Sequence, residues 1–330
     1  MASARRIRER RASVFRIVCD TLSDFPKEWC EAHDVHLVAM HLRGKYKDEL
    51  DVLGVHPADV YVDLAAKGIL RLSQPSAAEF MEVFNQLIDQ SDDPIICITA
   101  SSALVQVFDN AVAAAREVKK RCQVAVIDSK LVSAGEAMVV ADLVHARQVG
   151  MSFEEAIEHV QQLIPRVTVL FITPPGAALY NHTRSNPLKR LRTIVDGWTG
   201  SYGFVAMDGR GHLTRVGHHG DQRLLAGRIA RLMSLDAQRE GPLRYIEVSV
   251  GFPRNLSILE KPLDTNEFIS TRSTVINASG SVAVALGLGA MGIAYAPVRY
   301  LVHESSETDP LKDLESLERE GLVAHADDNL

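Results

Sequence analysis

The side chains best suited to chemistry in this sequence are small hydroxyls and carboxylates that directly follow apolar runs. Three such groups occur, at Asp20, Thr21 and Ser23, at Ser101 and Ser102, and at Asp128 and Ser129. Hydroxyl groups donate hydrogen bonds to an anionic ligand, whereas carboxylates serve acid–base and phosphoryl chemistry. The pattern therefore indicates a polar site and leaves the kind of chemistry open.

The apolar runs that carry these groups have the pattern of buried strands. Such runs lie at 14–19, 94–99 and 124–127. Each is followed by a helical pattern, which lies at 103–120 after the second run and at 132–149 after the third. Continuous apolar strands that alternate with helices are typical of a parallel sheet covered on both faces. Ligands of such sheets bind beyond the carboxyl ends of the strands, so we expect the polar groups to meet in one cleft.

The remaining patterns complete a two-domain α/β organisation. Ser76 with Glu79, and Ser152 with Glu155, have the spacing of capping boxes at helix starts. Further expected elements are helices at 25–33, 57–67, 77–89, 177–196 and 222–238, strands at 35–42, 167–173, 245–250 and 267–276, and a hairpin at 202–216. We predict a parallel sheet flanked by helices over 14–165 and a mixed α/β domain over 166–302. A disordered basic tail at 1–13 and an acidic tail at 303–330 would flank them.

Composition argues against several classes of protein. A net charge of −6 disfavours a broad nucleic-acid-binding face, which needs clustered Lys and Arg. No apolar run approaches the ~20 residues of a membrane-spanning helix. The cysteines Cys19, Cys30, Cys97 and Cys122 lack the close pairing of a zinc site. We expect buried free thiols in a cytoplasmic protein without a metal or cofactor.

Two motifs remain ambiguous from the residues alone. The glycines of 287–292 fit G-x-G-x-x-G, but a strand-like run follows them and no acidic residue stands ~20 positions on, so Gly287 and Gly289 indicate close packing or a ligand-facing loop instead of a nucleotide site. Arg184 lies in a basic stretch that is either a solvated helix face or a partner for an anionic head group. The sequence has no G-x-S-x-G elbow and no phosphate-binding G-x-x-x-x-G-K-[ST] loop.

In their order, these segments resemble the DegV family, bacterial fatty-acid-binding proteins that include the binding subunits of fatty acid kinase. The matching segments are DTLSDFP at 20–26, SQPS at 73–76, ITASSAL at 98–104, VIDS at 126–129 and GLGAMG at 287–292. The correspondence covers about 14–300, with compatible spacing throughout.

The resemblance implies two α/β domains that bind a long-chain fatty acid without chemistry. The acyl chain would be buried, and the carboxylate would lie at a polar interdomain site, where a separate kinase meets it. Burial of each CH₂ contributes about 0.8 kcal/mol, and a carboxylate removed from water needs hydrogen-bond donors. The head-group residues that the resemblance indicates are Ser101, Ser102, Arg184, Ser73, Asp20, Thr21, Ser23, Gly287 and Gly289.

The sequence departs from the family pattern around this head group. Leu72 stands where the family has a threonine, and Ala285 where it has a histidine. Two alternatives therefore stay open. One is an α/β enzyme for a small hydroxylated or phosphorylated substrate, with the suspected residues Asp20, Asp24, Asp128 and His182. The other is a diverged member whose pocket is closed by Leu72 and Val105 and which acts in protein–protein contact.

Overall fold

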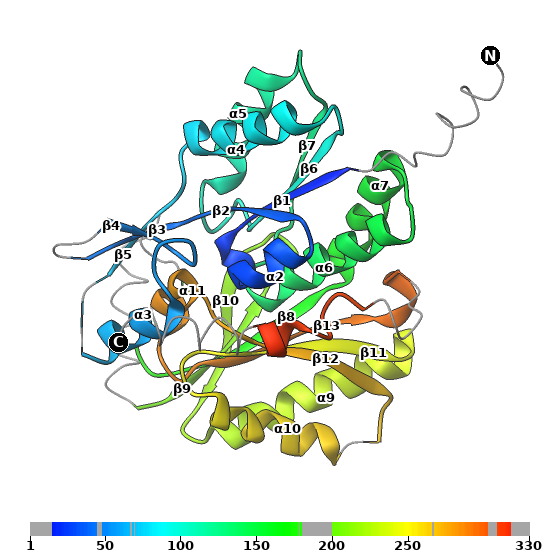
Figure 1. Cartoon of the computed structure of the whole chain (residues 1–330). Helices are drawn as coiled ribbons and strands as arrows, with labels where there is room; N and C mark the ends of the chain where they lie inside the picture. Colours follow the sequence, from blue (N-terminus) through cyan, green and yellow to red (C-terminus); the bar gives the residue numbers. More distant parts are fainter. Residues whose placement is uncertain are drawn as a thin grey trace.

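A computed structural model of the chain describes residues 15–44, 48–66, 68, 70–177, 179, 200–265, 267–302 and 309–317. Within these residues the strands form three sheets, of four, six and three strands. The four-stranded and six-stranded sheets lie one above the other, with a helical layer between them (Figure 1). This is the mixed α/β architecture that the sequence predicts.

The four-stranded sheet is parallel throughout, in the order β2-β1-β6-β7. Its strands are β1 (Arg16–Asp20), β2 (Val35–Val38), β6 (Ile95–Thr99) and β7 (Val124–Asp128). Every residue of β6 is buried, because helices cover both faces of the sheet. Helices α4 (Ala77–Gln90) and α5 (Val107–Val118) pack together on the side away from the six-stranded sheet (Figure 1).

Helix α6 (Ala134–Gln148) forms the layer between the two large sheets. It contacts β6 of the first sheet and β8, β11 and β13 of the second, and residues 134–146 are buried on every side of the helix. Helix α7 (Phe153–Leu163) packs against α6. One continuous apolar core therefore runs from the first sheet through α6 to the second.

The six-stranded sheet is mixed, in the order β10-β9-β8-β13-β11-β12. Only β11 and β12 pair in parallel; the other neighbours are antiparallel. Its strands are β8 (Thr168–Thr173), β9 (Tyr202–Met207), β10 (Leu213–His219), β11 (Leu243–Ser249), β12 (Ser270–Asn277) and β13 (Met291–Pro297). Helices α9 (Gln222–Glu240) and α10 (Ser257–Asp264) cover the face opposite α6 (Figure 1).

The strand expected at 35–42 is wrong in extent, because the chain leaves the parallel sheet after Val38. The Met40 N–H donates to Thr21 Oγ1, at 3.0 Å, and the chain then turns into β3 (His41–Arg43). This strand pairs with β4 (Asp48–Leu50) and β5 (Arg71–Ser73) in the small antiparallel sheet. Helix α3 (Pro57–Ala65) lies beside it and contacts α11 (Gly280–Leu286), a helix that the sequence did not predict.

The other sequence predictions are mostly confirmed. Both capping boxes form, at Ser76 with Glu79 and at Ser152 with Glu155. The predicted helix at 25–33 is α2 (Lys27–Ala32), and the hairpin at 202–216 is β9–β10. Helix α5 begins later than expected, because the N–H groups of Leu104 and Val105 both turn back to the Ser101 carbonyl. All four cysteines are buried free thiols.

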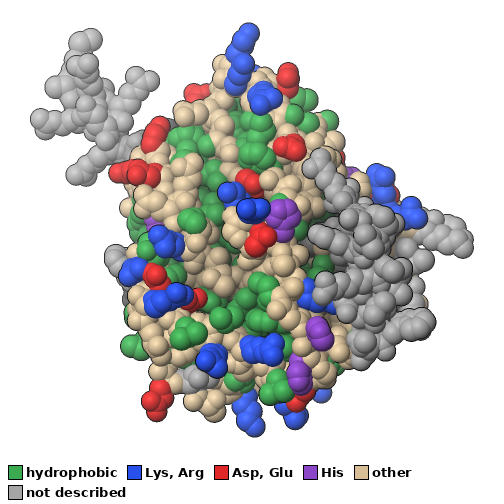
Figure 2. Space-filling model, turned by 180° about the vertical axis from the view of Figure 1, so that it is seen from behind, with side chains coloured by type: hydrophobic (Ala, Val, Ile, Leu, Met, Phe, Trp, Pro, Cys, Tyr) green, Lys and Arg blue, Asp and Glu red, His purple; other side chains and the backbone are tan. Residues whose placement is uncertain are grey.

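Several predictions fall wholly or mostly on residues outside the described ranges, namely the basic tail at 1–13, most of the helix at 177–196 and most of the acidic tail at 303–330. The domain boundary at 165 stays a prediction. Within the described part of the acidic tail, Leu311 and Leu314 are buried in the main core. None of the described helices is long and apolar enough to cross a membrane. Basic and acidic side chains are scattered among apolar and neutral groups across the face in Figure 2.

Candidate functional site

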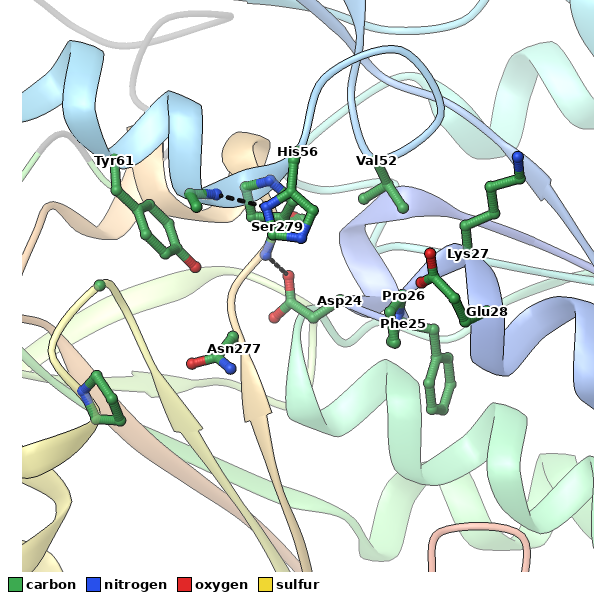
Figure 3. Close-up of a pocket in the computed structure, with 14 residues that line it drawn as sticks. Asp24, Phe25, Pro26, Lys27, Glu28, Val52, His56, Tyr61, Asn277 and Ser279 are labelled. Atoms are coloured by element: carbon green, nitrogen blue, oxygen red, sulfur yellow. Dashed lines mark hydrogen bonds between the residues drawn. The ribbon is translucent and has the colours of Figure 1, made fainter. Parts of the chain in front are cut away.

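A cavity of about 240 Å³ lies where the loop after β1 and the start of α3 meet the six-stranded half of the molecule. Its walls come from segments far apart in the sequence, and it is close to α11 (Figure 3). The lining residues are Asp24, Phe25, Pro26, Lys27, Glu28, Val52, His56, Pro57, Ala58, Tyr61, Gly251, Pro253, Asn277 and Ser279. The cavity is therefore bounded by apolar and aromatic groups, with a few polar ones among them.

Asp24 is the buried ionisable group of this cavity, with 3% of its surface exposed. It lies in the left-handed backbone region, with a φ of 61°, at the end of the short 3-10 helix η1 (Thr21–Ser23). The Ser279 N–H donates to Asp24 Oδ1 at 2.7 Å, and the Ser133 hydroxyl donates to Oδ2. Burial raises the pKa of Asp24 to about 7, although these hydrogen bonds oppose the shift.

A second buried carboxyl group, Asp51, holds the start of α11. The N–H groups of Gly280 and Ser281 donate to its two oxygens, each at 2.9 Å. A Cβ on Gly280 would lie 2.9 Å from Asp51 Oδ1, so glycine permits this close approach. Burial raises the pKa of Asp51 to about 6. Asp24 and Asp51, both from the first half of the chain, therefore fix α11 between the two halves.

Tyr61 and Asn277 face Asp24 across the cavity (Figure 3). The Tyr61 hydroxyl donates to the Ala278 carbonyl, and its ring lies against Gly251, where an added Cβ would be 3.5 Å away. His56 caps α3, its Nδ1 accepting the Ala58 N–H at 3.1 Å. The side chains of Tyr61 and His56 are thus held in place by hydrogen bonds to the backbone.

The predicted polar groups at the strand ends do meet, as the parallel sheet requires. Asp20 Oδ2 accepts the N–H of Ala100, at 2.8 Å, which joins the end of β1 to the end of β6. The Ser101 hydroxyl donates to the Gly211 carbonyl at 2.7 Å, and the Ser102 hydroxyl to Asp128 Oδ2 at 2.6 Å. Burial raises the pKa of Asp20 to about 6. The hydroxyls of Ser101 and Ser102 therefore already donate to acceptors within the protein.

Thr21 and Ser23 are fully buried and shape the turn after β1. Thr21 Oγ1 accepts the Met40 N–H, and the Ser23 hydroxyl donates to the Asp20 carbonyl at 2.8 Å. Both side chains therefore support the loop that carries Asp24.

The other predicted head-group residues are spread more widely. Ser73 is half-buried in β5 opposite His41, and Arg184 lies outside the described residues. Gly287 and Gly289 have φ values of 84° and 85°, in the left-handed region that favours glycine. These glycines follow α11 and precede β13, the reverse of the strand-then-helix order of a dinucleotide site.

A wider groove of about 580 Å³ lies beside the strand-end cluster. Asp128, Lys130 and Asp208 are among its lining residues, together with apolar side chains such as Phe108 and Met207. Neither this groove nor the Asp24 cavity is lined by any of the described residues predicted for the head group. Among the described residues, His, Cys, Asp and Glu form no cluster that could hold a metal ion.

Sequence reasoning missed Asp51, Tyr61 and Asn277, although it suspected Asp24. These residues stand alone in their local sequence, with no motif around them. Asp51 follows an exposed strand, and Tyr61 shows only the spacing of an ordinary amphipathic helix. Only the approach of α3 to the β12–α11 junction gives them a role.

Comparison with known sequences assigns the chain to a family. A family model described as the DegV family of uncharacterised proteins matches residues 14–298. The chain therefore belongs to the DegV family. A DegV domain-containing protein of Caldanaerobacter subterraneus subsp. tengcongensis is 30% identical over 184 residues, 55% of this chain and 63% of that protein. One from Staphylococcus aureus is 27% identical over 156 residues, covering 47% and 55%. The chain thus matches less than two thirds of the length of these relatives.

Solved structures share the fold over most of the chain. A stearic-acid-binding protein from Eubacterium ventriosum matches with a TM-score of 0.74 and 20% identity, over 87% of this chain and 99% of that one. A DegV family protein from Thermus thermophilus, described by its fatty acid binding, matches with a TM-score of 0.72 and 17% identity, over 86% and 99%. A fatty-acid-binding DegV protein from Bacillus subtilis gives 0.72 and 18%, with the same coverage.

Proposed function

We propose that this protein binds a long-chain fatty acid, or a similar amphiphilic carboxylate, without catalysing a reaction on it. The observation that carries the proposal is the shared fold over most of the chain with proteins described as fatty-acid binding. A bound acyl chain would have to be enclosed by apolar side chains, and the continuous core between the two large sheets is the part of the described structure that offers them. The expected location is the cytoplasm.

The carboxylate of the ligand would lie beside the ends of β1 and β6. Ser101 and Ser102 supply the hydroxyls there, and Arg184 the cation. Because the Ser101 hydroxyl donates to the Gly211 carbonyl, ligand binding would have to exchange this hydrogen bond for one to the carboxylate. Asp20, Thr21, Ser23, Ser73, Gly287 and Gly289 would shape the surroundings without direct ion pairing. A separate fatty acid kinase would then act on the presented carboxylate.

Native mass spectrometry of the freshly purified protein, followed by solvent extraction, tests the proposal directly. We expect a fatty acid at near-stoichiometric occupancy. After delipidation, oleate or palmitate should bind to the unaltered chain and at least severalfold more weakly to Ser101→Ala and Arg184→Ala. Ser91→Ala, at the end of α4, is a matched control that should leave binding unchanged.

An empty protein that also refuses added fatty acid would overturn the proposal. The second candidate, a closed family member that acts in protein–protein contact, would then be favoured. The specific observation behind it is the engaged Ser101 hydroxyl, with Val105 buried nearby at 4% exposure. If Ser101→Ala and Arg184→Ala both bind fatty acid as tightly as the unaltered chain does, the head group must lie at another site.

A further inference from the structure

We propose that the cavity beside Asp24 is a second ligand site, separate from the fatty acid site, and that it takes a small apolar molecule bearing one protonated amine. Asp24 would pair with the ammonium group, and the walls of the cavity would enclose the apolar part. Nothing in this inference depends on whether the chain binds a fatty acid.

The size of the cavity sets the scale of the ligand. Pockets for drug-sized molecules span about 300–1,000 Å³. At about 240 Å³ the cavity lies below that range, so it fits a compact molecule better than a long acyl chain. Phe25, Pro26, Val52, Pro57 and Pro253 supply apolar surface to its walls.

The charge of the cavity favours a cation. Among the described residues, the charged group that perturbs Asp24 is the carboxyl group of Asp51, and no basic side chain is among the groups that act on Asp24. Lys27 lines the cavity, but its ammonium group pairs with Glu31 at 3.6 Å and points away from Asp24 (Figure 3). A buried carboxylate without a cation is costly, and a bound ammonium would supply the missing charge.

Asp24 also has room for a further donor. Its oxygens accept hydrogen bonds from the Ser279 N–H and from the hydroxyls of Ser133 and Ser279, while an ionised carboxylate can accept about four. The Tyr61 ring and hydroxyl face the same space (Figure 3). An aromatic ring attracts a nearby cation through the negative face of its π-system. The pKa of Asp24, which burial raises to about 7, is that of a carboxyl group whose charged form has no neighbouring cation to stabilise it.

An anionic ligand finds no comparable support here. The N–H groups at the start of α11 would attract an anion, but they already have acceptors. Ser279 donates to Asp24, Gly280 and Ser281 donate to Asp51, and Val282 donates to the Ser279 hydroxyl. Asp24 and Glu28 would repel a carboxylate or phosphate at close range.

Calorimetric titration of the delipidated full chain with three matched probes tests the assignment. We expect 2-phenylethylammonium to bind, and 2-phenylethanol and 3-phenylpropanoate to bind at least tenfold more weakly. Near pH 6, where Asp24 is mostly protonated, amine binding should release protons, seen as a heat that changes with the ionisation enthalpy of the buffer. Equal or tighter binding of the acid or the alcohol would overturn the proposal.

Variants separate this site from its surroundings. Asp24→Asn should weaken amine binding at least tenfold, and Ala58→Phe should abolish it by filling the cavity from the start of α3. Ala65→Phe, exposed at the end of the same helix, is the matched control and should bind like the unaltered chain. If Asp24→Asn fails to fold, Ala58→Phe and Ala65→Phe decide the result alone. Equal amine binding by these two variants would refute the site. Loading with stearate should leave amine affinity unchanged; its loss would refute a separate site.

Discussion

At the scale of single residues, buried carboxyl groups are the main polar feature of the interior around the end of β1 and the start of α11. Asp20, Asp24 and Asp51 are almost fully inaccessible, and each accepts backbone N–H groups from a segment distant in sequence. Burial raises the pKa of all three, to between about 6 and about 7. The hydrogen bonds stabilise the charged forms, but the loss of water outweighs them.

These shifts predict that the free energy of unfolding falls as the pH rises from about 4 to about 7. The folded state binds protons more tightly than the unfolded chain, so the contribution of these groups is complete below the unfolded pKa and is lost as the pH passes the folded pKa. Denaturant unfolding at several pH values measures the slope. Asp24→Asn should reduce the total change by at least about 1 kcal/mol. Asp59→Asn, exposed on α3, should not, and equal slopes in all three proteins would contradict the prediction.

At the scale of elements, α6 joins the two large sheets because small residues allow close packing on both sides. Gly135 shows how tight the contact is: an added Cβ would lie 2.3 Å from Val169 Cγ2 of β8. Distances this short require the backbone or the neighbouring side chain to move. Helix α6 therefore sets the separation of the sheets.

Gly135→Ala should destabilise the protein by about 1–3 kcal/mol through overpacking against Val169. Gly227→Ala is the matched control, because Gly227 is exposed in the middle of α9 with open space around it. There the same change should stabilise by about 0.5–1 kcal/mol, since alanine favours the helix. Thermal or denaturant unfolding of both variants measures the difference. A stability loss of the same size at both positions would contradict the packing argument.

At the scale of the whole molecule, residues 309–317 pack against the first half of the chain. They are the described part of the acidic segment near the C-terminal end. The Trp29 indole N–H donates to the Pro310 carbonyl at 2.7 Å, and Leu314 is fully buried in the main core. Trp29 also stacks on Phe25, which lines the Asp24 cavity. The segment at 309–317 is therefore part of the fold that supports the cavity.

Leu314→Ala should cost about 2–5 kcal/mol, the range for a large-to-small change in a closed core. Leu232→Ala, 39% exposed on α9, removes the same atoms from the surface and should change the stability by no more than about 0.5 kcal/mol. Equilibrium unfolding followed by circular dichroism compares the two. Similar small losses would mean that the segment at 309–317 contributes little to stability.

The sequence by itself determined the local elements and the edge where polar groups gather. Continuous apolar runs predicted β1, β6 and β7, and their parallel arrangement brought Asp20, Ser101 and Ser102 together as expected. Capping boxes placed the starts of α4 and α7, because those hydrogen bonds join residues three positions apart. The motifs in their order also indicated the family.

Tertiary structure alone decided what these groups can bind. Whether the Ser101 hydroxyl is free for a ligand depends on Gly211, 110 positions away, and the cavity depends on Asp24 meeting Ser279. Local patterns carry no signal for such contacts, because burial and hydrogen-bond partners arise only when distant segments pack. Helix α11 was missed for the same reason: its seven residues are held by Asp24 and Asp51 from the other half of the chain and show no helical period of their own.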